Sequence, residues 1–437
     1  MLERLLPVLA LAATAGVQAA AVTAPADGPT PLSQGSEPRA ALEQVTFAEA
    51  VDRAVGRHPT VAQAAQAILR AEALLDQAKS VFRPTIYGGV GTTVLDAARG
   101  FDGNVTQPRT QSALNATLSY PVLAAARWAA KNQAADHVGI ARVSAEETRR
   151  LVAFAAAQSY LAVLAARHQR EIAVRNRATA KALAEYATAR LQAGKGSRLN
   201  EVRSFRELAT TEGAAEAAEL AVDQAQEALG VAIFADGPVD ARGEPEVRPA
   251  PPPSHDEALL AQRPDVRLFA AQERAADRVV RDSWTSWLPT ATASFTPQYV
   301  TPAGLFEPAR TWRALFQLQI PIYDGTLGAA KRVRIADREA ARARLDLVRL
   351  QARAEQRLAR EAVARSERIA ASIRGAAESA VEALRITEIA YRAGATSNVE
   401  VVQAQQTARN AEIESVLADD RLRQARLDLL VALGQFP

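Results

Sequence analysis

Two stretches of the chain, each longer than a hundred residues, contain no proline. They run from Val122 to Gly237 and from Ile322 to Phe436, and both are rich in Ala, Arg, Glu, Gln and Leu. These residues favour helices, whereas a proline inside a helix costs about 3 kcal/mol. Each stretch carries a glycine near its middle, Gly194 or Gly394, where a helix would end and the chain would turn back. The sequence therefore predicts two long helical hairpins.

The two halves of the chain repeat one another. Five short motifs recur in the same order at an offset of 200 to 205 residues. We therefore expect a first repeat over residues 44–235, a proline-rich connector with little helix or strand signal over 236–253, and a second repeat over 254–437. The motif pairs are His58–Val61 with Arg263–Val266, Phe82–Thr85 with Trp287–Thr290, Leu118–Val122 with Leu318–Ile322, Ala193–Gly194 with Ala393–Gly394, and Ala228–Gly230 with Ala432–Gly434.

Both repeats begin with the same helix signal. Thr46–Glu49 and Ser254–Glu257 each fit a capping box, in which a hydroxyl and a glutamate three residues later cap the first turn. We expect a short helix after each box and a second helix that begins at Pro59 or Pro264.

The N-terminus has the pattern of a secretory signal. Arg4 gives a short positive region, Leu5–Val17 an apolar region, and Ala19–Ala21 a cleavage zone of small residues. We assign residues 1–21 to a signal peptide and 22–43 to a disordered leader rich in Pro, Gly and Ser, so the mature chain is expected to be exported. We expect no helical membrane span after it.

Two predicted β-hairpins, at about 85–120 and 290–320, lie between the helices of each repeat. Thr290–Thr296 and Trp312–Ile320 alternate polar and apolar residues, as about ten residues do in each strand of a transmembrane β-barrel. The segments Asp96–Gln111 and Val300–Thr311 are expected to be loops. Aromatic residues gather near the strand ends, where a membrane interface would lie. Four prolines are assigned to helix–strand junctions: Pro84, Pro121, Pro289 and Pro321.

Four strands are too few to close a barrel, because bacterial barrels begin at about eight strands. An open sheet in lipid would leave unpaired edge groups that each cost several kcal/mol. The strands therefore belong either to a soluble sheet or to a barrel that several copies of the chain share. The second alternative predicts an obligate oligomer.

Composition argues against most kinds of chemistry. The chain has no cysteine and four scattered histidines, so we expect no metal and no cofactor. Its 52 basic and 49 acidic side chains give a net charge of +3, and acids interrupt the arginine-rich run Lys331–Arg353, so we expect no nucleic-acid partner. Phosphate-binding, nucleophile-elbow and zinc-protease motifs do not occur, and we predict that the protein is not an enzyme.

Three motifs in order resemble the TolC-type outer-membrane efflux proteins. The resemblance covers residues from about Gln44 to Gly434. It implies a homotrimer with a twelve-stranded transmembrane β-barrel, four strands from each chain, above a long α-helical barrel in the periplasm. It also implies contact with outer-membrane lipid, a periplasmic adaptor and an inner-membrane pump of the RND or ABC type. The motifs are Arg263–Val266, Leu318–Gly325, and Tyr391–Gly394 followed by Asn398–Gln405.

The resemblance also implies a gate at the hairpin turns, where acidic side chains of the family narrow the pore and select for cations. Glu400 occupies the position of one such acid. Gln403 stands where a second acid is common, and Asn200 where the first repeat often has Asp, with Glu201 beside it. Arg198 and Tyr391 are candidate partners in closing bonds. The alternative is that these are ordinary solvated residues at helix ends.

Residues at the same turns are candidates for adaptor contact, the alternative being simple packing at the turn. They are Gly194, Lys195, Ser197, Leu199, Val202, Gly394, Val399 and Val401.

The leading hypothesis is a passive outer-membrane exit duct of a tripartite export system that removes small molecules. Two alternatives remain at this point: the outer-membrane component of a type I protein secretion system, and a soluble periplasmic coiled-coil scaffold without a pore. The repeated alternating hairpins favour a duct, because a scaffold has no need of them.

Overall fold

The computed structural model describes residues 42–245, 260–304 and 308–436. The expected signal peptide, nearly all of the expected leader, the second half of the connector and the second capping box lie outside these residues. The expected leader included residues 42 and 43, which are described, and Glu43 already belongs to a strand.

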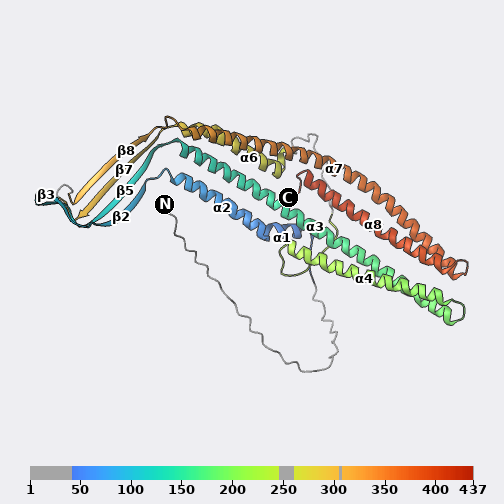
Figure 1. The fold of residues 1–437 in the computed structure, drawn as a ribbon. Coiled ribbons are helices and arrows are strands. Elements are labelled where there is room, and N and C mark those ends of the chain that lie inside the picture. The colour runs from blue at the N-terminus through green and yellow to red at the C-terminus, as the bar shows by residue number, and fades with distance from the viewer. Residues whose placement is uncertain (1–41, 246–259, 305–307, 437) are drawn as a thin grey trace, which may run out of the picture. The chain divides into compact units, whose positions relative to one another are not determined.

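Two long helical hairpins form the main body of the described chain, as the proline-free stretches predicted. The first consists of α3 (Ala125–Gln192) and α4 (Arg198–Ala232), and the second of α7 (Gly325–Arg392) and α8 (Asn398–Ala432). In each hairpin the first helix has 68 residues and the second has 35. At 1.5 Å per residue the longer helices extend for about 100 Å. Figure 1 shows the two hairpins side by side.

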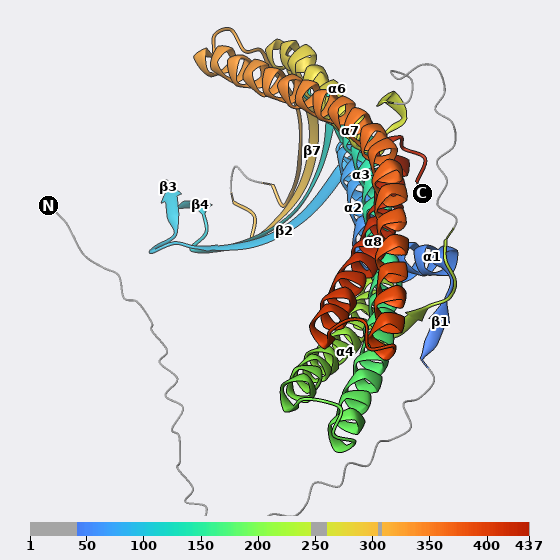
Figure 2. The ribbon, with the colours of Figure 1, turned by 90° about the vertical axis from the view of Figure 1, so that its right-hand side faces the viewer.

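A left-handed glycine ends the first helix of each hairpin. Gly194 has φ of +71° and Gly394 has φ of +80°, a region that residues with a Cβ rarely adopt. Ser197 and Ser397 then cap the second helices, each through a side-chain oxygen that accepts a backbone N–H three residues later. Both turns lie at the end of the long helices that is farther from the strands (Figures 1 and 2).

Shorter helices extend the wall beside the long ones. These are α1 (Phe47–Arg57), α2 (Pro59–Ser80), α6 (Pro264–Arg281) and the 3-10 helix η1 (Asp282–Trp287). The expected capping box of α1 is present, since the Thr46 hydroxyl accepts from the Glu49 N–H and the Glu49 carboxylate accepts from the Thr46 N–H. Helix α3 contacts both α2 and α6, and α6 contacts α7. These four helices therefore lie in one curved row in the order α2, α3, α6, α7.

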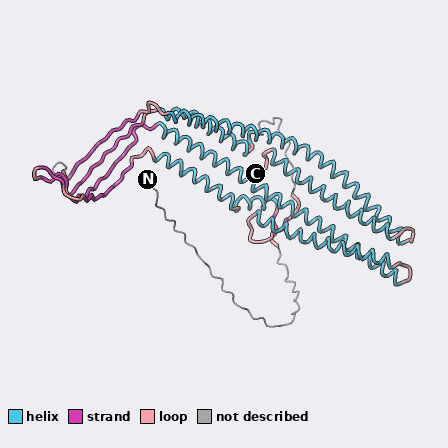
Figure 3. Tube along the Cα trace, in the orientation of Figure 1, coloured by secondary structure: helices cyan, strands magenta, loops and turns pink. Residues whose placement is uncertain are grey.

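A four-stranded antiparallel sheet lies at the N-terminal ends of α3 and α7, away from the hairpin turns (Figure 3). Its order is β2 (Thr85–Val94), β5 (Thr110–Ala124), β7 (Thr290–Thr301), β8 (Arg310–Gln319). The central β5–β7 pair joins the two repeats, while β2 and β8 form the edges. Among the described residues of one chain, the outer sides of these two edge strands have no partner strand.

The register separates an apolar face from a polar face. One row across the sheet consists of Ile86, Leu118, Phe295 and Ala314, and a row on the other face consists of Gly89, Asn115, Gln298 and Thr311. The apolar face is exposed in the single chain, as the 73% exposure of Ile86 illustrates. An exposed apolar face on one side and a polar face on the other is the pattern of strands between lipid and a lumen.

Three of the four junction prolines lie where they were expected. Pro84 and Pro289 immediately precede β2 and β7, and Pro321 follows β8. The assignment of Pro121 was wrong, because β5 continues through it to Ala124. The register shifts between Pro121 and Leu123, and such a bulge accommodates a residue that cannot donate to the strand ladder.

Four short strands were missed. β1 (Glu43–Val45) pairs in parallel with β6 (Val239–Ala241) inside the expected connector, and β3 (Arg99–Phe101) pairs with β4 (Asn104–Gln107) inside an expected loop. Runs of three or four residues are too short to show a period of two.

The largest core cluster surrounds the β1–β6 pair. Tyr160 of α3 is fully buried there, packs edge-on against Phe47, and its hydroxyl lies 2.8 Å from the carbonyl oxygens of both Arg242 and Gly243. Helix α3 is also the one described helix that is long and apolar enough, over one stretch, to cross a membrane by length and composition alone. Half of that stretch is buried within the chain, as expected of a core helix.

Candidate functional site: the hairpin turns

The acid of the second hairpin turn points into solvent. Glu400 lies in the first turn of α8, where its backbone N–H donates to the Ser397 hydroxyl at 3.4 Å. Its side chain is exposed and forms no ion pair with any described residue. Gln403 is exposed one turn further along the same helix. The first turn of a helix is a position at which the helix dipole favours an acidic side chain.

The acid of the first hairpin turn is arranged differently. Glu201 is buried, its carboxylate pairs with Arg198, and it accepts a hydrogen bond from the Thr188 hydroxyl at 3.1 Å. The expected gate acid of this turn is therefore neutralised inside its own hairpin. Asn200 is half-buried, and its backbone N–H donates to the Ser197 hydroxyl at 3.3 Å. Arg198 is thus engaged with Glu201, not with the second hairpin.

Tyr391 connects the two hairpins near the turns. Its ring is buried with Leu183, Val401 and Val402, which brings α3, α7 and α8 into one small core. The Tyr186 ring of α3 packs edge-on against the Tyr391 ring, with 5.7 Å between centroids.

The side chain of Arg190 lies over both of these rings. The Arg190 guanidinium lies 5.8 Å from the Tyr186 centroid and 5.3 Å from the Tyr391 centroid. Cation–π contacts of this kind contribute about 0.5–1 kcal/mol at exposed sites. Sequence reasoning missed Arg190 and Tyr186, although their spacing of four residues places both on one face of a helix.

The residues expected to meet an adaptor divide into exposed apolar side chains, exposed polar side chains and one buried side chain. Leu199, Val202 and Val399 are exposed apolar side chains, and Phe205 extends the exposed apolar surface along α4. Lys195 and Ser197 are exposed polar residues of the first turn, which also contains Gly194, whereas Gly394 lies in the second turn. Val401, in contrast, is 0% exposed. Its assignment to a contact surface was therefore wrong, because the side chain belongs to the core around Tyr391.

Further along the hairpins, α4 and α8 meet through buried polar groups. The Glu207 carboxylate lies 2.5 Å from Arg409 and accepts a hydrogen bond from the Gln406 amide at 3.1 Å. The Asn398 amide donates to the Ser204 hydroxyl at 3.4 Å, with both residues buried. These contacts were not predicted, since their partners are about two hundred residues apart in the sequence.

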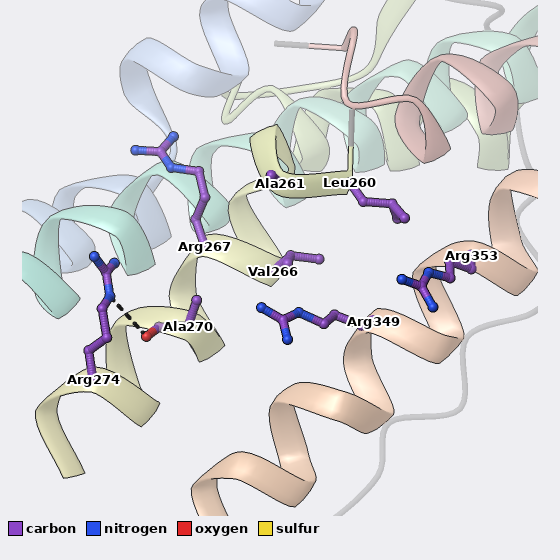
Figure 4. Close-up of a pocket in the computed structure, with 8 residues that line it drawn as sticks. All are labelled: Leu260, Ala261, Val266, Arg267, Ala270, Arg274, Arg349 and Arg353. Carbon is purple, nitrogen blue, oxygen red and sulfur yellow. Dashed lines mark hydrogen bonds between the residues drawn. The ribbon is translucent and has the colours of Figure 1, made fainter. Parts of the chain in front are cut away.

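A separate pocket of about 420 Å³ lies between α6 and α7 (Figure 4). Leu260, Val266 and two alanines form its apolar part, and four arginines line the rest. Arg267 pairs with Glu146 at 2.8 Å, and Arg274 donates to the Ala270 carbonyl at 3.2 Å. The lining residues include no acid and no nucleophile, so this pocket offers no acid–base pair for catalysis.

A protein-family model matches the two halves of the chain that contain these turns. The model described as outer membrane efflux protein matches residues 50–233 and 257–435. These two segments correspond to the two repeats. The chain belongs to the outer membrane efflux protein family.

Solved structures share the fold of this efflux protein across nearly its whole length. The CmeC outer membrane channel of Campylobacter jejuni is 16% identical, with a TM-score of 0.79 over 89% of this chain and 85% of CmeC. VceC of Vibrio cholerae is 16% identical, with a TM-score of 0.75 over 89% of this chain and 96% of VceC. The open-state MtrE channel of Neisseria gonorrhoeae is 17% identical, with a TM-score of 0.76 over 89% and 88%. No curated protein matches the sequence significantly.

Membership places this efflux protein in the outer membrane, with its helices extending into the periplasm. Family membership also decides between the two alternatives for the strands, which were a soluble sheet and a barrel shared by several copies of the chain. The four strands contribute to a barrel that is shared between chains, and three copies give the twelve strands of this fold. The free edges of β2 and β8 are then the places where neighbouring chains join, which satisfies the backbone groups that lipid cannot.

Proposed function

We propose that this efflux protein is the passive exit duct of a tripartite system that expels small molecules. One observation carries the proposal: a sheet that is apolar on one exposed face and unpaired at both edges continues into helices about 100 Å long. Such a chain gains a lipid-spanning wall and a periplasmic tube only when copies assemble around an axis. No chemical step is assigned to it.

The periplasmic entrance of the duct lies at the two hairpin turns. Three copies of Glu400, each exposed and without an ion-pair partner among the described residues, form its acidic ring. Gln403 and Asn200 contribute polar but uncharged groups, so the ring carries fewer charges than an entrance with acids at these positions. Like charges at close range repel, and the ring therefore favours cations over anions.

The closed position of the turns depends on contacts between the hairpins. The aromatic pair Tyr186 and Tyr391, covered by Arg190, holds α7 against α3. Arg198 acts indirectly, because it keeps the buried Glu201 neutralised within the first hairpin.

A periplasmic adaptor contacts the exposed apolar side chains beside the turns. Leu199 and Val202 on α4 and Val399 on α8 are exposed although they are apolar, which is characteristic of a protein–protein contact surface. Lys195 and Ser197 supply polar groups at its rim. The inner-membrane pump supplies the energy, and the duct only conducts.

Single-channel recording in planar lipid bilayers tests the duct and its entrance together. Wild-type protein should form channels that prefer potassium over chloride, and Glu400→Lys should reduce or reverse this preference. Glu414→Lys makes the same change on α8 fourteen residues further from the turn, about 21 Å away, and should have a smaller effect. Equal selectivity of wild type and Glu400→Lys would remove Glu400 from the entrance, and absence of any channel would contradict the duct.

The proposed cargo class has its own test. Cells that lack this protein should accumulate a fluorescent dye that wild-type cells expel, and restoring the chain should restore expulsion. Unchanged dye accumulation together with loss of a secreted protein would instead assign the duct to type I secretion.

A further inference from the structure

The four strands of the sheet contain two charged residues, Arg310 and Arg313, both on β8. A separation of three residues places them on opposite faces of the sheet. The four strands have 10, 15, 12 and 10 residues, and all of their other side chains, on both faces of the sheet, are uncharged. The fixed charge of the barrel wall therefore depends on where these two arginines point.

Arg310 belongs to the apolar face. It is the first residue of β8, opposite Tyr299, and it lines a groove together with Leu114 and Pro297 of that face. A long basic side chain at the end of a lipid-facing strand can extend its charged group to the water interface. The charge of Arg310 is thus directed away from the lumen.

Arg313 belongs to the polar face. It lies opposite Thr296, whose hydroxyl is 3.2 Å from the Thr117 hydroxyl in the next strand. Gln317 and Gln319 continue the same face along β8. Arg313 is exposed and forms no ion pair with any described residue, so its charge acts on the space in front of this face.

The position of Arg313 is close to the mouth of the barrel. Strand β8 runs towards α7 and hence towards the periplasm, so its first residue is at the extracellular end. Three residues at about 3.4 Å each place Arg313 about 10 Å inside that end. Three chains then supply three copies at one level.

Barrel geometry decides whether these charges act on the pore. Twelve strands spaced about 4.8 Å apart and tilted about 40° give a wall radius of about 12 Å. The Debye length at physiological salt is about 8 Å, so a guanidinium that extends only about 4 Å inward influences ions on the axis.

We infer that three copies of Arg313 form a cationic ring near the extracellular mouth, which favours anions leaving the duct and opposes cations entering it. The inference rests on the proposed function, because the ring exists only in the shared barrel. It assigns the two ends of the duct opposite charge: Glu400 at the periplasmic entrance and Arg313 at the exit.

Two single-channel measurements test the ring. The ion selectivity is measured in a salt gradient, and block of the channel is measured with a trivalent anion. In Arg313→Gln the permeability ratio of chloride to potassium should fall at least about threefold, and block by hexacyanoferrate(III) added on the extracellular side should weaken. Arg313→Lys should behave like wild type. Arg310→Gln is the matched control, since it removes the same charge from the same strand on the lipid face and should change neither quantity.

A second variant addresses the case in which Arg313→Gln does not assemble. Thr296→Glu keeps Arg313 and places a carboxylate opposite it, which should neutralise the ring and weaken block in the same direction. Wild-type selectivity and block in both variants would overturn the inference and leave the duct intact. Absence of channels in the wild type would overturn both.

Discussion

The guanidinium of Arg409 on α8 lies 2.5 Å from the carboxylate of Glu207 on α4, and this ion pair joins the two helical hairpins. The Glu207 side chain is only 4% exposed, and it also accepts a hydrogen bond from Gln406. A buried charge is tolerated when it is paired and hydrogen-bonded, and becomes costly when one partner is lost. This ion pair is therefore one of the contacts between the hairpins, and it is lost when either side chain is replaced.

Replacing Arg409 with Ala should destabilise the protein by about 3 kcal/mol per chain, because it leaves the buried Glu207 carboxylate without its cationic partner. Glu207→Gln should cost less, since the amide can still bond to Gln406. Denaturant unfolding of the detergent-extracted protein at fixed concentration measures both. Glu412→Gln is the control, because the Glu412–Arg175 pair is 3.9 Å long and more exposed, and its loss should cost less than about 1 kcal/mol. Equal stability of Arg409→Ala and wild type would contradict the role of the pair.

The aromatic contact near the turns gives a second prediction. Tyr391→Ala removes a buried ring from the cluster of Leu183, Val401 and Val402, and should cost about 3–5 kcal/mol. It should also loosen the turns, so that a protease added to the extracted protein cleaves there faster. Tyr391→Phe retains the ring and the cation–π contact with Arg190 and should resemble wild type. Fast cleavage of both variants, or of neither, would show that the ring does not hold the hairpins together.

The start of α6 gives a third prediction. Arg263 is buried, and its guanidinium lies 2.7 Å from Asp265, 2.8 Å from Glu355 and 3.2 Å from the carbonyl oxygen of Ala432. Arg263→Met should lower the free energy of unfolding at neutral pH by about 3 kcal/mol, because it leaves the largely buried Asp265 carboxylate and the Ala432 carbonyl without their partner. Arg267→Met, which breaks an exposed pair with Glu146, should change it by less than about 1 kcal/mol. Similar losses in the two variants would contradict the importance of burial here.

The same contact predicts how stability depends on pH. Burial alone would raise the pKa of Asp265, but the hydrogen bonds and charge of Arg263 outweigh it and hold that pKa below its ordinary value. A lowered pKa in the folded state contributes stability that is present above the unfolded value of about 3.9 and lost as pH falls through the folded value. Asp265→Asn should remove this part of the acid sensitivity. Identical acid unfolding curves for Asp265→Asn and wild type would contradict the assignment.

The helical part of the fold could be predicted because its causes are local. Absence of proline over Val122–Gly237, together with helix-forming residues, is enough to specify α3 and α4, and Gly194 marks their turn through a backbone conformation that other residues avoid. The alternation in β7 and β8 is also local, which is why the apolar face of the sheet followed from the sequence.

The candidate site was less predictable because its contacts are distant in sequence. Nothing near Glu207 indicates that Arg409, about two hundred residues away, completes its ion pair. Burial of Glu201 and Val401 depends on how the hairpins pack, so two residues expected at an accessible surface proved to be inside. The position of Pro121 could not be predicted for another reason, since a bulge in β5 accommodates this proline within the strand.

One chain supplies only part of the proposed pore. Light scattering of the detergent-extracted protein, with the detergent contribution subtracted, measures the mass of the protein alone. The proposed duct predicts a mass three times that of the mature chain, because β2 of one copy must pair with β8 of the next. A stable monomer that stays in solution without detergent would contradict the shared barrel and with it the duct.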